Sequence, residues 1–129
     1  MLSTDSKYVV LVTGSRTWPQ PEWIYEDLHQ LHELFGDLLV VRHGKCRSGA
    51  DNWAKQFCEA ERIEQDQVPA DWDKYGRRAG FVRNAEMVDK FPVPNLCLAY
   101  IHFNSNGATM CSDIADNAGV YVLRREIND

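Results

Sequence analysis

Two short loops in this sequence combine glycine with hydroxyl and basic side chains. Thr13-Gly14-Ser15-Arg16 follows a β-branched run at residues 8–12, and the loop 43–51 follows an apolar run at residues 38–41. Glycine lets the backbone approach a ligand closely, and an arginine guanidinium matches the geometry of a phosphate. The second loop leads into a helical pattern, whose free N–H groups favour an anion. Both loops predict an anion site; the alternatives are a surface Arg16 and a Ser48 that only caps a helix.

A third loop, residues 69–80, offers side chains that suit a nucleotide. Its aromatic rings could stack on a base, its arginines could meet phosphates, and Asp71 could accept from a ribose hydroxyl or an amino group. The other candidates in this loop and the following helix are Trp72, Tyr75, Arg77, Arg78 and Arg83. The alternative interpretation is that Trp72 covers the core and the arginines are solvated.

A fourth small, polar loop precedes the last helical pattern of the chain. It spans residues 104–109, and we expect Thr109 to donate to an anion there. The loop 43–51 also contains His43 and Cys46, which could form a catalytic dyad. Two such residues three apart in one loop are more often a coincidence.

The apolar pattern predicts the elements that must position these loops. Short apolar runs typical of strands occur at residues 8–12, 38–41, 63–68, 96–101 and 120–123, and helical stripes occur at residues 23–35, 50–61, 78–90 and 108–118. The run 63–68 is polar and indicates an edge strand. Strict alternation predicts an α/β fold: a single Rossmann-like three-layer domain with a parallel sheet of about five strands and helices on both faces. Ligands bind beyond the carboxyl ends of such strands, where all four loops converge.

Composition narrows the class of protein. The length of 129 residues fits one domain. The net charge of −5 argues against nucleic acid or an anionic membrane as a partner. Ten of the 14 basic residues lie within residues 42–90, where an anion site belongs. No apolar run approaches the roughly 20 residues of a membrane helix. Residues 1–5 lack the pattern of a signal peptide, so we expect a cytoplasmic protein.

The cysteines predict neither disulfides nor a metal site. None of the four forms a C-x-x-C pair or finger-like spacing with histidine. Cys58, Cys97 and Cys111 fall on apolar faces and are expected in the core as reduced thiols.

The motifs together resemble the YspA-like branch of the SLOG superfamily over residues 8–123, within a domain expected to span residues 1–129. The matching segments are Val12-Thr13-Gly14-Ser15-Arg16-Thr17-Trp18, Val41-Arg42-His43-Gly44 with Cys46, Ser48-Gly49-Ala50-Asp51, Pro69-Ala70-Asp71-Trp72, Tyr75-Gly76-Arg77, Ala79-Gly80, Arg83-Asn84 and Met87-Val88. The resemblance implies a Rossmann-like domain that binds nucleotides or nucleotide derivatives. It also implies a homo-oligomer. Such proteins are common in phage and bacterial genomes, and if this one is phage-encoded we expect it in the host cytoplasm. By motif position the ligand would be lined by Gly14, Ser15, Arg16, Gly44, Ser48, Gly49, Asp51, Arg83, Asn84 and Thr109.

One departure from the superfamily bears on catalysis. The Lonely Guy phosphoribohydrolases, which are relatives, carry P-G-G-x-G-T-x-x-E at the last helix start, with a catalytic glutamate. Here Ser112 stands three residues past Thr109, and Asp113 follows it. We therefore expect a nucleotide-binding module, acting as a sensor, carrier or sequestering protein without a further cofactor. The alternative is a nucleoside-monophosphate hydrolase using Asp113 or Asp51. A DprA-like single-strand DNA binder is disfavoured by the acidic charge.

Overall fold

The computed structural model of the chain describes residues 6–103 and 105–129. The expectations for residues 1–5 and for Asn104 lie outside this part. The strands and helices are β1 (Tyr8–Gly14), α1 (Pro21–Phe35), β2 (Leu39–His43), α2 (Ala50–Glu61), β3 (Glu64–Gln67), α3 (Trp72–Tyr75), α4 (Ala79–Asp89), β4 (Leu96–His102), α5 (Asn106–Asn117) and β5 (Tyr121–Ile127). Short 3₁₀ turns at Gly36–Leu38 and Gly76–Arg78 complete the described elements.

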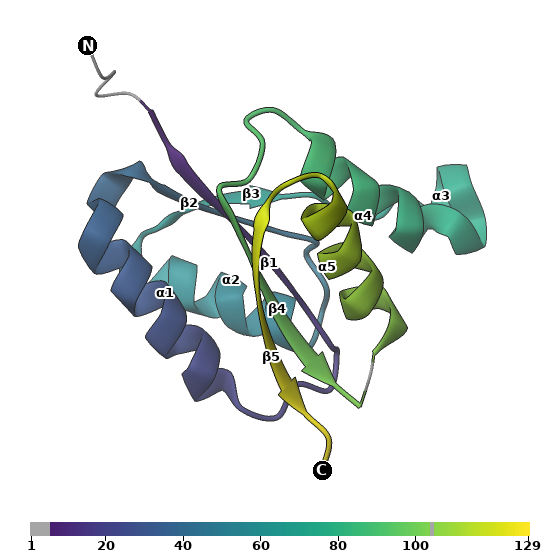
Figure 1. Ribbon diagram of the computed structural model, residues 1–129, viewed down its shortest axis with the longest axis horizontal. Helices are drawn as coiled ribbons and strands as arrows, with labels where there is room; N and C mark the ends of the chain where they lie inside the picture. The colour runs from purple at the N-terminus through teal and green to yellow at the C-terminus, as the bar shows by residue number, and fades with distance from the viewer. Residues whose placement is uncertain (1–5, 104) are drawn as a thin grey trace.

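The five strands form one parallel sheet in the order β3-β2-β1-β4-β5. Helices α1 and α2 cover one face of the sheet, and α4 and α5 cover the other (Figure 1). The predicted Rossmann-like α/β fold is therefore confirmed, including β3 as a short edge strand. The chain winds outward from β1 to β3 and then returns to β4 on the other side of β1. This reversal creates the switch point at which ligands bind in such sheets.

The core consists of two apolar layers that meet the sheet from opposite sides. Val10, Val12 and Tyr100 face α1 and α2, while Leu11 and Cys97 face α4 and α5. This alternation follows from the period of two along each strand. Cys58, Cys97 and Cys111 are all buried, as predicted.

Several element boundaries differ from the predicted ones, and the structure gives a physical reason for three of the differences. The loop at 69–76 contains the one-turn helix α3, because the Asp71 side chain caps it by accepting from the Lys74 backbone N–H at 3.1 Å. Strand β5 continues beyond residue 123 to Ile127, since β4 pairs with it along its whole length. Helix α5 begins at Asn106, before the apolar stripe, with Ser105 as the N-cap residue in a non-helical conformation.

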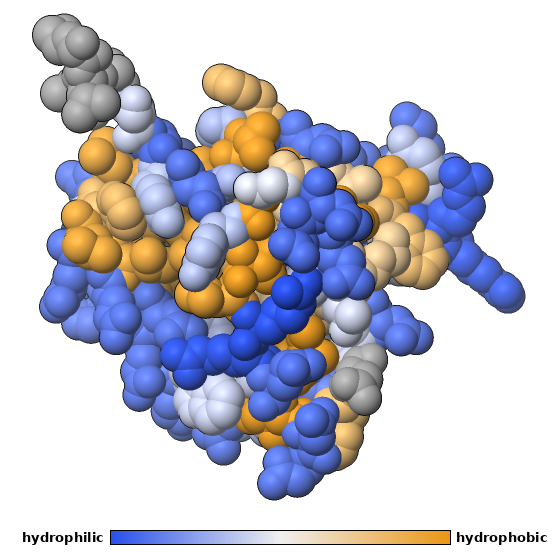
Figure 2. All heavy atoms as spheres, viewed as in Figure 1, coloured by the Kyte–Doolittle hydropathy of each residue, from blue (hydrophilic) through white to orange (hydrophobic). Residues whose placement is uncertain are grey.

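The surface of the β5 side mixes polar and apolar side chains (Figure 2). Strand β5 is an edge strand, and its Tyr121 and Leu123 are exposed. In the described part of the chain, no helix combines the length and the hydropathy needed to cross a bilayer.

A buried arginine fastens α4 to the sheet. Arg42, in β2, is 1% exposed, and its Nε donates to Asp66 Oδ2 in β3 at 2.8 Å. Its two terminal nitrogens donate to the carbonyl oxygens of Met87, Lys90 and Pro92 at 2.8–3.1 Å. These bonds hold the end of α4 and the following loop against β2. Arg42 therefore fixes the position of the helix that carries Arg83.

We expect the free energy of unfolding to fall when Asp66 is protonated in acid. Burial raises the pKa of this carboxyl group, but hydrogen bonds from Lys90 and Arg42 outweigh it, so the pKa is lowered in the fold. A carboxylate with a lowered folded pKa stabilises the protein above its unfolded pKa and loses this contribution as the pH falls through the folded pKa. Urea unfolding at pH 7 and pH 3 tests this: Asp66→Asn should lose less stability between the two pH values than the unaltered protein, and an equal loss would contradict it.

Candidate functional site

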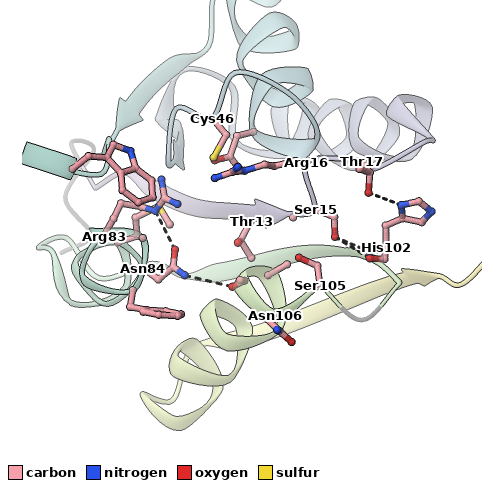
Figure 3. Close-up of a pocket in the computed structure, with 18 of the residues that line it drawn as sticks. Thr13, Ser15, Arg16, Thr17, Cys46, Arg83, Asn84, His102, Ser105 and Asn106 are labelled. Carbon is pink, nitrogen blue, oxygen red and sulfur yellow. Dashed lines mark hydrogen bonds between the residues drawn. The ribbon is translucent and has the colours of Figure 1, made fainter. Parts of the chain in front are cut away.

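A cavity of about 470 Å³ opens at the carboxyl ends of β1 and β4, at the switch point of the sheet. Its walls come from the loop after β1, from α4, and from the loop that leads into α5 (Figure 3). Eight residues predicted from the sequence line it: Gly14, Ser15, Arg16, Asp51, Trp72, Arg77, Arg83 and Asn84.

A second hollow of about 310 Å³ adjoins the first on the side of the loop after β2. The two hollows share Arg16, Cys46, Trp72 and Arg83 as lining residues. Two more predicted residues, Gly44 and Ser48, line only the second. The structure therefore brings most of the predicted residues to one continuous surface.

Ser15 connects the ends of β1 and β4. Its hydroxyl accepts from the His102 N–H at 2.8 Å and donates to the His102 carbonyl at 3.4 Å (Figure 3). Its own carbonyl accepts from the N–H groups of Trp18 and Ala50, each at 3.2 Å. The Ser15 hydroxyl is thus committed to holding the loop in place, and the side chain is only 3% exposed.

Two glycines let the loop after β1 and the start of α2 pack closely. A Cβ on Gly49, whose φ is +75°, would collide with the backbone of Ser15 and Arg16. A Cβ on Gly14 would collide with Ala50 and lie 2.8 Å from the Tyr100 carbonyl oxygen. Gly49 lines neither hollow, so its role in the structure is to permit this packing.

A chain of hydrogen bonds links the loop after β2, helix α4 and the start of α5. Arg83, in α4, donates from Nη1 to the Gly44 carbonyl at 2.8 Å and from Nε to Asn84 Oδ1 at 3.1 Å. Asn84 in turn donates from Nδ2 to the Gly107 carbonyl at 3.4 Å (Figure 3). A Cβ on Gly44 would collide with the Arg83 guanidinium. The glycine therefore makes room for the arginine.

The two helix N-termini near the cavity differ in charge. Asp51 lies in the first turn of α2, is 5% exposed, and accepts from the Gly44 N–H at 3.1 Å. Its carboxylate already occupies the positive end of α2. Helix α5 has no acidic residue in its first turn, and the Ser105 side chain makes no capping hydrogen bond. The first N–H groups of α5 belong to Asn106, Gly107 and Ala108, all of which line the cavity.

Cys46 and His43 do not form a catalytic dyad. The His43 Nδ1 accepts from the Lys45 N–H at 3.0 Å, so the proton lies on Nε2, which pairs with Gln65 Oε1 at 2.8 Å. Burial, followed by the charge of Asp51, raises the pKa of the Cys46 thiol. A raised pKa keeps the sulfur protonated and weakens it as a nucleophile.

Several predicted residues lie outside both hollows. Asp71 is the cap of α3. Thr109 lies in the second turn of α5, because the helix begins earlier than predicted. Asp113 is exposed and pairs with Arg124 at 3.1 Å. Tyr75 carries the Lys74 ammonium over its ring, 5.1 Å from the centroid.

The structure also adds residues that sequence reasoning missed. Thr17 and His102 line the cavity and pair with each other, with 2.7 Å between Thr17 Oγ1 and His102 Nδ1. His102 ends β4, and the rule that ligands meet strand ends could have found it. Ser105 and Asn106 lie within the predicted polar loop 104–109, and the preference for serine at a helix N-cap singles out Ser105.

Comparison with known proteins identifies the family of the chain. The family described as "YspA, cpYpsA-related SLOG family" matches residues 8–75. The chain is 37% identical over 120 residues to the Gene 61 protein of Mycobacterium phage D29, covering 88% of this chain and 93% of that relative. No solved structure gives a significant match. The chain belongs to the YspA, cpYpsA-related SLOG family, a family with a nucleotide-related binding role.

Proposed function

We propose that the protein binds a nucleotide or a nucleotide derivative in the cavity at the switch point, as a sensor, carrier or sequestering module. The observation that carries this proposal is that the N-terminus of α5, Arg16 and Trp72 line the same cavity. These three features supply partners for the phosphate and the base of one ligand.

The phosphate is expected at the N-terminus of α5. The free N–H groups and the positive end of the helix dipole attract an anion there, and the cavity wall at α5 carries no competing carboxylate in the first turn. Arg16 is exposed, and in the described part of the chain no carboxylate lies within ion-pair distance of it. Its guanidinium extends over the cavity towards Cys46 (Figure 3). It is therefore free to pair with the phosphate.

The base is expected at the α4 end of the cavity. Trp72 and Phe81 both line this end and are each 53% exposed. An exposed aromatic face can stack on any base, which contributes about 1–3 kcal/mol per base. Stacking gives affinity without naming the base, so we test all four common ones.

Replacing Arg16 by alanine should weaken binding by about 1.5–3 kcal/mol, because a charge-assisted hydrogen bond to the phosphate is lost. Titration calorimetry with the 5′-monophosphates of adenosine, guanosine, cytidine and uridine measures this. Arg62→Ala, at the opposite end of α2, is the matched control and should bind like the unaltered protein. Unchanged affinity in Arg16→Ala would show that Arg16 is a solvated surface residue without a role in binding. If none of the four monophosphates binds, the phosphate and base assignments are contradicted.

A further inference from the structure

The second hollow is lined by four basic side chains that form no ion pair with a carboxylate of the described residues. Arg16, Lys45, Arg47 and Arg83 all contribute to its lining. In the described part of the chain, none of these four lies within ion-pair distance of an aspartate or glutamate. Ion pairs there involve Lys7, His29, Arg42, Lys55, Lys90, Arg124 and Arg125, whereas Arg62, Lys74, Arg77 and Arg78, outside this hollow, form none. In a chain with a net charge of −5, this grouping of unpaired cations indicates a place for an anion.

The loop that carries two of these cations is held by buried contacts. Lys45 has a φ of +56°, a backbone conformation that residues other than glycine rarely adopt. Its N–H donates to Nδ1 of His43, which is fully buried and fixed through Gln65. The Gly44 carbonyl before it accepts from Arg83. The unusual backbone is thus stabilised by its surroundings and presents Lys45 and Arg47 at the exposed side of the hollow.

The two hollows are continuous along one wall. Arg16, Cys46, Trp72 and Arg83 line both of them. A ligand whose phosphate lies at the start of α5 can therefore extend past Arg16 and Cys46 into the second hollow. The cations of the second hollow lie on the side of the loop after β2, whereas α5 lines only the first.

We propose that the second hollow is a separate anion subsite, and that the natural ligand is a nucleotide with a second phosphate group held by Lys45 and Arg47. This inference rests on the proposed nucleotide binding in the first cavity. The second phosphate has two chemical sources: another position of the same ribose, as in a nucleoside 3′,5′-bisphosphate, or a pyrophosphate that joins two nucleosides. Both present the same charged group to the hollow, and the experiment separates them.

Calorimetry at about 0.15 M salt, where distant charges are screened, uses three probes with one base. The first probe is the 5′-monophosphate that binds most tightly, or adenosine 5′-monophosphate if none binds. The second is the 3′,5′-bisphosphate of the same nucleoside, and the third is its dinucleoside diphosphate. We expect one of the last two to bind at least about tenfold more tightly than the monophosphate, as a charge-assisted contact would provide. The double variant Lys45→Gln/Arg47→Gln should lose that gain while its affinity for the monophosphate stays within about threefold.

The control is the double variant Lys55→Gln/Arg62→Gln, which removes the same charge from α2 outside both hollows. It should keep the gain. If neither two-phosphate probe binds more tightly, or if the gain survives in Lys45→Gln/Arg47→Gln, the second subsite is wrong while monophosphate binding still supports the proposed function. If no probe binds at all, both proposals fall. Binding of a two-phosphate probe alone, lost in Lys45→Gln/Arg47→Gln, supports the second subsite, while the missing monophosphate binding counts against the phosphate and base assignments in the first cavity.

Discussion

Replacing Arg42 by alanine should lower the free energy of unfolding by about 3–5 kcal/mol, the cost typical of breaking a buried ion pair by removing one partner. The guanidinium is 1% exposed and donates to Asp66 and to three backbone carbonyl groups. Alanine leaves those acceptors without a donor and leaves a cavity. Because the carbonyl groups belong to the end of α4 and the next loop, the position of Arg83 should loosen as well.

Urea unfolding followed by circular dichroism measures this loss. Lys55→Ala is the control, since Lys55 forms only a partly exposed ion pair of 3.9 Å with Glu59 on α2. Such pairs are worth about 0.3–0.5 kcal/mol. A loss below about 1 kcal/mol in Arg42→Ala would show that the buried network contributes no more than surface ion pairs do.

The second prediction is that the protein binds nucleoside monophosphates without releasing the base. General acid–base catalysis by a positioned group contributes about 10²–10⁴ in rate. Where the related hydrolases carry glutamate, this chain has Ser112, which is fully buried and donates to the Thr109 carbonyl at 2.8 Å. Asp113 pairs with Arg124 and lies outside the cavity lining. Asp51 does line the cavity, but its carboxylate accepts from the Gly44 N–H.

Chromatography of each monophosphate after incubation with the protein tests this prediction. We expect no free base above the level of a protein-free sample. If base appears, the variants Asp51→Asn and Asp113→Asn show which carboxylate is responsible. The matched control is Asp116→Asn, which removes an exposed carboxylate on α5. Base release that Asp51→Asn or Asp113→Asn abolishes, and that Asp116→Asn leaves intact, would establish the hydrolase alternative.

The order of elements could be predicted because local patterns carried it. β1 and β4 are buried on both faces and form short apolar runs, and α2 and α5 show stripes at helical spacing. Boundaries set by tertiary contacts could not be predicted. The polar end of β5 has no apolar pattern of its own, and it is a strand because β4 offers it hydrogen-bonding partners.

The location of the candidate site was also predictable in part, because it follows from the predicted topology. The parallel topology places every loop after a strand at one edge, so Arg16, Asp51 and Asn84 could be assigned to one place. The individual roles depend on distances between residues far apart in the chain. The Ser15 hydroxyl is committed to His102, 87 residues away, and this pairing leaves no trace in local sequence.

By itself, the sequence determined the α/β alternation, the edge of the sheet at which the candidate site residues gather, and the lack of the hydrolases' glutamate at its usual position. These follow from the period of apolar residues and from residue identity, both of which are local. Only the tertiary structure decided which helix end is open to an anion. Asp51 folds back over the start of α2 and accepts from Gly44, whereas the start of α5 faces the cavity without an acidic side chain in its first turn. That distinction depends on where a carboxylate lies in space, because the electrostatic field at a helix terminus is set by distance rather than by sequence order.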